Sequence, residues 1–87
     1  MKGLGADRTG ALAKSLAGRD KGEIFVIIQE NREYVFLADG KGRPAGEPKR
    51  KNKKHIQVIC KGLDHKEKLT DEEIRRLIRC YKRESQV

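Results

Sequence analysis

A run of cations is the feature of this sequence that points most clearly to a binding chemistry. Five of the six residues from Lys49 to Lys54 are basic, and only Asn52 interrupts them. The five are Lys49, Arg50, Lys51, Lys53 and Lys54. Each phosphate that such a cluster neutralises releases condensed counterions, which gives affinity for nucleic acid with little sequence preference. We expect a short flexible segment that reaches several phosphates; a solvated charge run is the alternative interpretation.

A second basic feature is a turn bracketed by two glycines, Gly18-Arg19-Asp20-Lys21-Gly22. The glycines permit a positive φ and therefore a tight reversal between strands. Asp20 can accept hydrogen bonds from nearby backbone N–H groups and hold the turn. Arg19 and Lys21 would then project from a fixed loop toward a polyanion. The alternative is an ordinary hairpin turn with solvated charges.

The net charge of +8 is concentrated in one part of the 87-residue chain. Residues 1–40 are balanced, whereas residues 41–61 carry eight Lys and Arg against one Glu. That stretch includes Lys41 and Arg43, which lie in a segment rich in Gly and Pro, residues 39–48, that we expect to form a loop. A concentrated excess of positive charge creates a local potential that attracts polyanions.

Aromatic residues are scarce, at 5% of the chain. They are Phe25, Tyr34, Phe36 and Tyr81. Proteins that bind single strands usually stack bases on several aromatic side chains, and here only Tyr34 is a credible stacking residue. We therefore expect recognition of structured RNA through shape and phosphate contacts rather than base reading.

The sequence offers no pattern typical of catalysis or metal binding. His55, Cys60, His65 and Cys80 do not have the paired spacing of a zinc site. No nucleophile–base order, paired carboxylates or phosphate-binding loop is present. We therefore expect no enzyme activity, metal, cofactor or small-molecule substrate. No apolar stretch approaches the roughly 18 to 20 residues of a membrane span, and the few cysteines favour a cytoplasmic location with no membrane partner.

Alternating and β-branched segments predict short strands at residues 10–15, 23–29, 33–38 and 55–60. The strand at residues 23–29 is apolar on both faces and should be central and buried. Together with glycine-rich turns, these segments predict a mainly β fold, a small β-barrel over residues 10–60. Residues 1–9 are expected to form a flexible N-terminal arm, and residues 61–69 a linker.

The pattern of residues 70–84 predicts a C-terminal helix. Thr70 and Glu73 have the spacing of a capping box. Acidic residues of the first turn are spaced to pair with arginines four residues later, as in Asp71 and Arg75. The apolar stripe of this helix consists of Ile74, Leu77, Ile78 and Tyr81. The stripe should dock on the barrel or on a partner. A basic face carries Arg75, Arg76, Arg79, Lys82 and Arg83, and it is interpreted as solvated, with an RNA- or ribosome-docking helix as the alternative.

Three blocks of the chain resemble the KOW motif proteins. Residues 15–28 contain the segment Ala-Gly-Arg-Asp-Lys-Gly followed by a strand, residues 34–40 read Tyr-Val-Phe-Leu-Ala-Asp-Gly, and residues 48–57 carry the basic run. They are similar to the bacterial KOW-domain RNA-binding proteins related to the archaeal and eukaryotic large-subunit ribosomal protein fourteen-e. The resemblance implies a five-stranded SH3-like barrel that binds RNA through loops and basic surface. It also implies that Gly18, Asp20 and Gly22 form the motif turn.

Two departures from the family pattern occur. Many KOW motifs have another glycine after the turn, where this chain has Glu23, Ile24 and Phe25, and the first strand has Ala11-Leu12-Ala13 where bulkier residues are usual. The sequence thus predicts a non-catalytic protein that binds ribosomal or other structured RNA, with the ribosome as an expected partner. The alternative is a protein-interaction module that docks an acidic partner surface or a partner helix.

Overall fold

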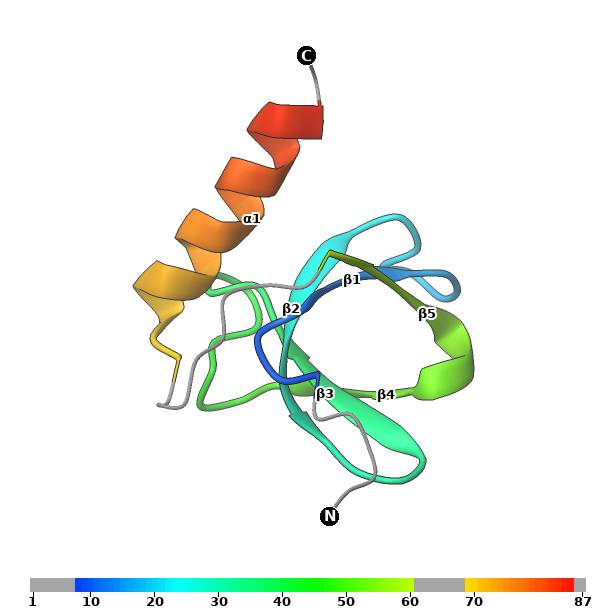
Figure 1. Cartoon of the computed structure of the whole chain (residues 1–87). Coiled ribbons are helices and arrows are strands. Elements are labelled where there is room, and N and C mark those ends of the chain that lie inside the picture. The colour runs from blue at the N-terminus through cyan, green and yellow to red at the C-terminus, as the bar shows by residue number, and fades with distance from the viewer. Residues whose placement is uncertain (1–7, 61–68, 86–87) are drawn as a thin grey trace.

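A computed structural model describes residues 8–60 and 69–85 of the chain (Figure 1). Its elements in chain order are β1 (Leu12–Ser15), β2 (Ile24–Glu30), β3 (Tyr34–Ala38), β4 (Lys49–Asn52), a 3₁₀ turn η2 (Lys53–His55), β5 (Ile56–Cys60) and α1 (Asp71–Ser85). The arm predicted for residues 1–9 and the linker predicted for residues 61–69 lie almost entirely outside the described residues. No helix in the described ranges is long and apolar enough to cross a membrane.

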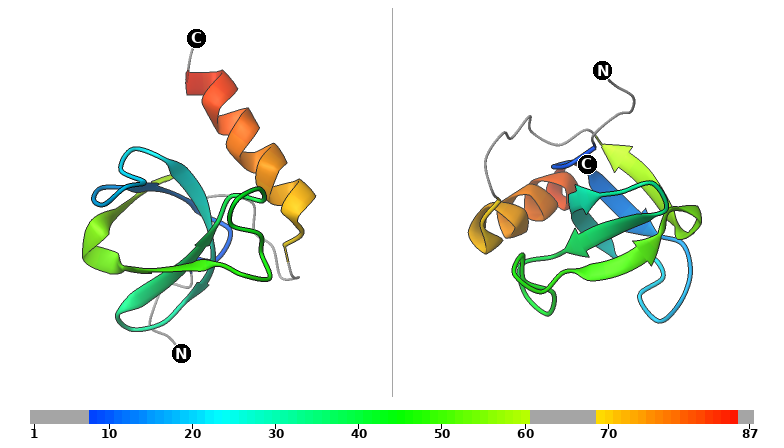
Figure 2. Two further views of the ribbon diagram at one scale, coloured as in Figure 1. Left: turned by 180° about the vertical axis from the view of Figure 1, so that it is seen from behind. Right: turned by 90° about the horizontal axis from the view of Figure 1, so that it is seen from below.

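The five strands form one antiparallel sheet in the order β4-β3-β2-β1-β5. The register of β2 against β3 shifts between Ile27 and Gln29, and such a shift lets a strand bend. The first and last strands of this order, β4 and β5, are joined by the three residues of η2, which brings the two edges of the sheet together (Figures 1 and 2). The predicted class, a mainly β fold with a small SH3-like barrel and a C-terminal helix, is confirmed.

One face of the sheet encloses the barrel interior. Phe25 and Ile27 alternate along β2 and point into this core, opposite Val35 and Leu37 of β3. The buried cluster consists of Ala11, Ala13, Phe25, Ile27, Val35, Leu37 and Ile56. The small side chains at Ala11 and Ala13 are buried here, and β1 forms although alanine is a weak strand former. Its pairing with β5 is irregular, because the register shifts between Leu12 and Ala13.

The opposite face of the same strands is covered by the helix. Val26 of β2, which is fully buried, packs with Ile74 and Ile78 of α1. The second cluster consists of Leu12, Val26, Ala38, Leu69, Ile74 and Ile78. This arrangement explains why β2 is apolar on both faces: one face fills the barrel and the other lies under α1 (Figure 2).

The helix begins as predicted and docks on the barrel. The Glu73 backbone N–H donates to Thr70 Oγ1, and the Thr70 N–H donates to Glu73 Oε1, each at 3.2 Å. This reciprocal pair is the predicted capping box. Because Ile74 and Ile78 are buried against the sheet, the apolar stripe is used within the chain and not left for a partner helix.

The first turn of α1 is also bonded to the β3–β4 loop. The Ala45 N–H donates to Asp71 Oδ1, and Arg75 Nη1 donates to the carbonyl oxygen of Gly40, both at 2.6 Å. The predicted ion pair between Asp71 and Arg75 is therefore wrong, because both side chains bond the loop instead. Gly40 has φ +78°, and a Cβ there would lie 2.6 Å from the Asp71 carbonyl oxygen, so only glycine fits this close approach.

Candidate nucleic-acid interface

The turn between β1 and β2 is held by the carboxylate of Asp20. Its Oδ1 accepts hydrogen bonds from Ser15 Oγ (2.7 Å) and Lys51 Nζ (2.6 Å), and its Oδ2 accepts from Lys49 Nζ (2.5 Å). Lys51 Nζ also donates to the carbonyl oxygen of Ala17 at 2.7 Å. Two lysines of β4 are therefore fastened to the turn, which follows β1 much earlier in the sequence.

This network keeps Asp20 ionised. Burial raises the pKa of Asp20, but hydrogen bonds from Lys49, Lys51 and Ser15 outweigh it and hold the pKa well below its ordinary value. One carboxylate with two ammonium groups leaves the cluster with a net positive charge. Sequence reasoning expected Asp20 to bond nearby backbone N–H groups; its carboxylate instead accepts from three side chains, two of them on a distant strand.

The basic run itself is ordered, so the expectation of a flexible segment is wrong. Lys49–Asn52 form β4, and Lys53–His55 form η2. The β4 register opposite β3 pairs Leu37 with Lys49, Phe36 with Arg50 and Val35 with Lys51. Alternation along the strand directs Lys49 and Lys51 to one face, where Asp20 lies, and Arg50 to the other. Strand pairing therefore divides the run between two faces.

Lys53 belongs to a second ion-pair cluster. Its Nζ lies 2.8 Å from Glu30 Oε2, which also accepts from Arg8 Nη2 at 2.6 Å. Burial raises the pKa of Glu30, but the hydrogen bonds from Arg8 and Lys53 prevail and lower it to about 2. Both clusters convert part of the basic run into structural contacts.

Arg50 lies against the aromatic residue singled out for base stacking. Its guanidinium carbon is 4.7 Å from the centroid of the Tyr34 ring, which is a cation–π arrangement. One face of Tyr34 is therefore covered by a cation from the chain itself. Arg50 remains exposed, as does Lys54 in the adjoining 3₁₀ turn.

Four further predicted cations are exposed and make no side-chain ion pair with the described residues: Arg19, Lys21, Lys41 and Arg43. Gly18 and Gly22 have φ of +89° and +91°, as the predicted turn requires. In the β3–β4 loop, Asp39 Oδ1 accepts from the backbone N–H groups of Lys41 and Arg43, both at 2.9 Å. Each loop is thus held by an aspartate: Asp20 accepts from side chains, and Asp39 accepts from backbone N–H groups.

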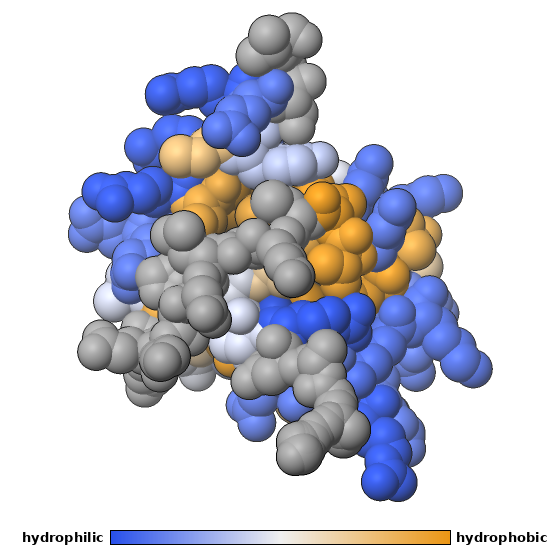
Figure 3. Space-filling view, viewed as in Figure 1, coloured by the Kyte–Doolittle hydropathy of each residue, from blue (hydrophilic) through white to orange (hydrophobic). Residues whose placement is uncertain are grey.

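The two loops meet around a hollow of about 260 Å³. Arg19, Arg43 and Lys49 line it, with the carboxylates of Asp20, Glu23 and Asp39. Lys53 and Lys54 lie at the other end of β4, by the β2–β3 hairpin. The predicted residues therefore divide into one group at the loop end and another at the hairpin end. On the face that Figure 3 shows, hydrophilic side chains lie around the edge.

Sequence reasoning missed Ser15 and Glu30. Ser15 is 1% exposed and sits at the end of β1, and its position five residues before Asp20 was a signal that could have suggested a contact across the turn. Glu30 had no comparable signal, because its partners Arg8 and Lys53 are distant in the sequence.

Among the described residues, no three His, Cys, Asp or Glu side chains are grouped so that they could hold a metal ion. His65 and the side chain of Cys60 lie outside that part of the chain. No protein-family model matches the sequence, and no curated protein matches it either.

Proposed function

We propose that this protein is a non-catalytic RNA-binding protein that contacts the phosphates of structured RNA, ribosomal RNA first among them, through its basic loops. The observation that carries the proposal is the Asp20 network, which fixes Arg19 and Lys21 on a rigid turn beside Arg43. Cationic side chains on a rigid backbone segment lose less conformational freedom on binding than those on a flexible segment.

The structure changes the roles proposed for the basic residues. Lys49, Lys51 and Lys53 already have carboxylate partners, so a phosphate would compete with Asp20 or Glu30 for them. We assign Lys49 and Lys51 to positioning the turn. Direct phosphate contacts are assigned to the exposed cations Arg19, Lys21, Lys41, Arg43, Arg50 and Lys54.

The resemblance to the bacterial KOW-domain proteins supports the same proposal. The motif residues Gly18, Asp20 and Gly22 occupy a tight turn with two positive φ values, and the basic segment packs directly on that turn. A protein of this kind would work in the cytoplasm, in association with ribosomal or other ribonucleoprotein particles.

The experiment is a salt titration of binding to a fluorescent RNA hairpin. The logarithm of affinity should fall linearly with the logarithm of salt concentration, because phosphate contacts release counterions. Arg19→Gln with Lys21→Gln should reduce the magnitude of that slope by roughly 1.5 to 2. A flat slope for the wild-type protein would contradict the proposal.

The matched control is Arg76→Gln with Arg83→Gln. It removes the same amount of charge from exposed positions on α1 that do not line the hollow between the two loops. Equal loss of slope in both double variants would mean that overall charge, and not the turn, determines binding.

The alternative, a module that pairs with a partner helix, loses support because Ile74 and Ile78 are buried within the chain. Docking to an acidic protein surface would draw on the same cations. Capture of a protein partner that survives nuclease treatment would favour it over RNA binding.

A further inference from the structure

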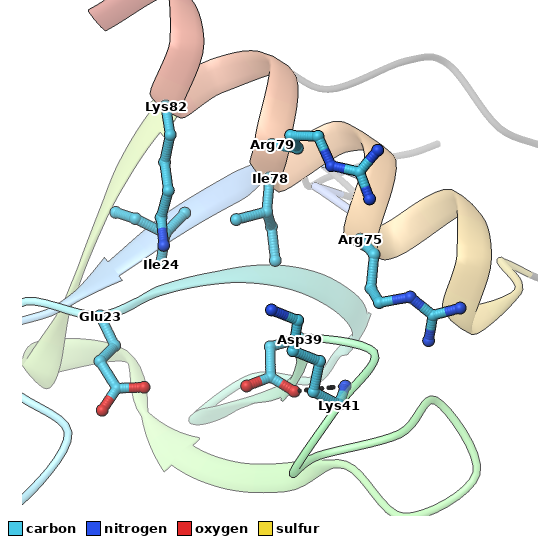
Figure 4. A pocket seen from close by; sticks show the side chains of 8 residues that line it. All are labelled: Glu23, Ile24, Asp39, Lys41, Arg75, Ile78, Arg79 and Lys82. Carbon is cyan, nitrogen blue, oxygen red and sulfur yellow. Dashed lines mark hydrogen bonds between the residues drawn. The ribbon is translucent and has the colours of Figure 1, made fainter. Parts of the chain in front are cut away.

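A cleft of about 370 Å³ lies between α1 and the barrel, next to the hollow at the loop end (Figure 4). Arg75, Arg79 and Lys82 line it from the helix. Glu23, Asp39 and Lys41 line it from the loops, and Ile24 and Ile78 supply its apolar surface. Four cations from segments far apart in the sequence thus meet around one concavity.

The three helix cations form one row. Arg75, Arg79 and Lys82 are spaced i, i+4 and i+7, so they share a helix face next to the buried stripe. Seven residues of α-helix rise about 10 Å. A row of that length is too long for one phosphate and suits successive phosphates of a backbone.

The row of helix cations is held in a fixed position relative to the loop that carries Lys41. Ile74 and Ile78 anchor α1 on the sheet, and the bond from Arg75 to the Gly40 carbonyl ties the helix to the loop that carries Lys41. Arg79 and Lys82 are therefore attached to the same rigid unit as the β3–β4 loop.

The charges in the cleft are unbalanced. Four cations face two carboxylates, and one oxygen of Asp39 is already engaged by the loop N–H groups. Within the described ranges, Lys41, Arg79 and Lys82 form no ion pair. Unpaired cations gathered in a concavity concentrate positive potential and attract an anion.

The cleft adjoins the hollow lined by Arg19, Arg43 and Lys49, and the carboxylates of Glu23 and Asp39 lie between the two. Together they make a basic track that leads from the β1–β2 turn across the β3–β4 loop to α1.

We propose that this cleft binds the phosphate backbone of base-paired RNA, an inference that rests on the RNA-binding function proposed above. Its lining contains no aromatic side chain on which an unpaired base could stack. Regularly spaced phosphates on a duplex suit a straight row of cations on a helix, and duplex RNA is recognised mainly by shape and backbone contacts.

The test compares full-length wild-type protein with Arg79→Gln/Lys82→Gln, using Arg76→Gln/Arg83→Gln as the control. The control residues lie on the same helix, carry the same charge and line no part of the cleft. Affinities for an RNA hairpin, and for an unpaired oligoribonucleotide of equal length, are measured across a range of salt concentrations. Circular dichroism verifies that each variant retains its helix.

We expect the cleft variant to lose roughly 1.5 to 2 from the magnitude of the hairpin salt slope and at least tenfold in affinity at low salt, and the control to lose less than a third as much. If the cleft variant binds RNA as the wild-type protein does, the proposal for the cleft is overturned and the proposed function still stands. A cleft-dependent preference for the unpaired oligonucleotide overturns the assignment to base-paired RNA. Absence of RNA binding by the wild-type protein overturns both proposals.

Discussion

Asp20 and Lys51 lie 31 positions apart in the sequence, and their side chains meet at 2.6 Å with only 10% and 8% of their surfaces exposed. The contact joins the glycine-bracketed turn to the basic strand β4. Each of these two features would be a surface element by itself, and the contact makes them one structural unit. The basic run therefore contributes to folding as well as to surface charge.

Replacing Asp20 by Asn should destabilise the protein, because it leaves the buried ammonium of Lys51 without a charged partner. We expect a loss of about 3 kcal/mol in the free energy of unfolding. Urea denaturation followed by circular dichroism measures it.

Glu33→Gln is the control for that experiment, since Glu33 is an exposed carboxylate with no side-chain ion pair in the described structure. It should change the free energy of unfolding by less than about 0.5 kcal/mol. Similar effects of the two substitutions would show that Asp20 behaves as an ordinary surface charge.

Acid should destabilise the protein through the two ion-paired carboxylates, Asp20 and Glu30. Glu30 has a pKa lowered from 4.5 to about 2 by Arg8 and Lys53, and the pKa of Asp20 is also depressed. A depressed folded-state pKa stabilises the protein above the unfolded-state pKa, and this stabilisation is lost as the pH falls toward the folded-state value.

The free energy of unfolding should therefore fall steadily below about pH 4.5. Glu30→Gln should cost about 2 kcal/mol at pH 7 and flatten the decline between pH 4.5 and 2. Denaturation across a pH series measures both effects. An unchanged pH profile in the variant would contradict the role assigned to Glu30.

Gly40→Ala should weaken the docking of α1. Its Cβ would lie 2.6 Å from the Asp71 carbonyl oxygen and 2.7 Å from Arg75 Cγ, at a φ of +78° that alanine rarely adopts. We expect a loss of about 2 kcal/mol and faster hydrogen exchange of the helix amides.

Gly42→Ala provides the comparison, because a Cβ at Gly42 meets nothing within 4 Å. It should leave hydrogen exchange in α1 unchanged. Equal exchange rates in both variants would mean that the loop does not hold the helix in place.

The elements of this fold follow from local patterns that the sequence displays. The two glycines of the turn and the Thr70–Glu73 capping box predict local geometry correctly, because both depend on residues within a few positions of one another. The helix stripe predicts a buried face, although not the surface that buries it.

The distribution of the cations could not be predicted in the same way. Composition identifies Lys49 to Lys54 as basic, but the partners of Lys51 and Lys53 come from the register of β4 and from carboxylates more than twenty residues away. The helical spacing places Arg75, Arg79 and Lys82 on one face of α1, but their position beside Lys41 depends on how α1 docks on the barrel.

The most direct test of the whole account is an NMR titration of isotope-labelled protein with an RNA hairpin. We expect the largest amide shift changes at residues 18–22, 39–43 and 75–82, where the described cations surround the two concavities, and smaller changes at Arg50 and Lys54. Small, uniform changes, or changes confined to the β2–β3 hairpin at residues 31–33, would contradict it.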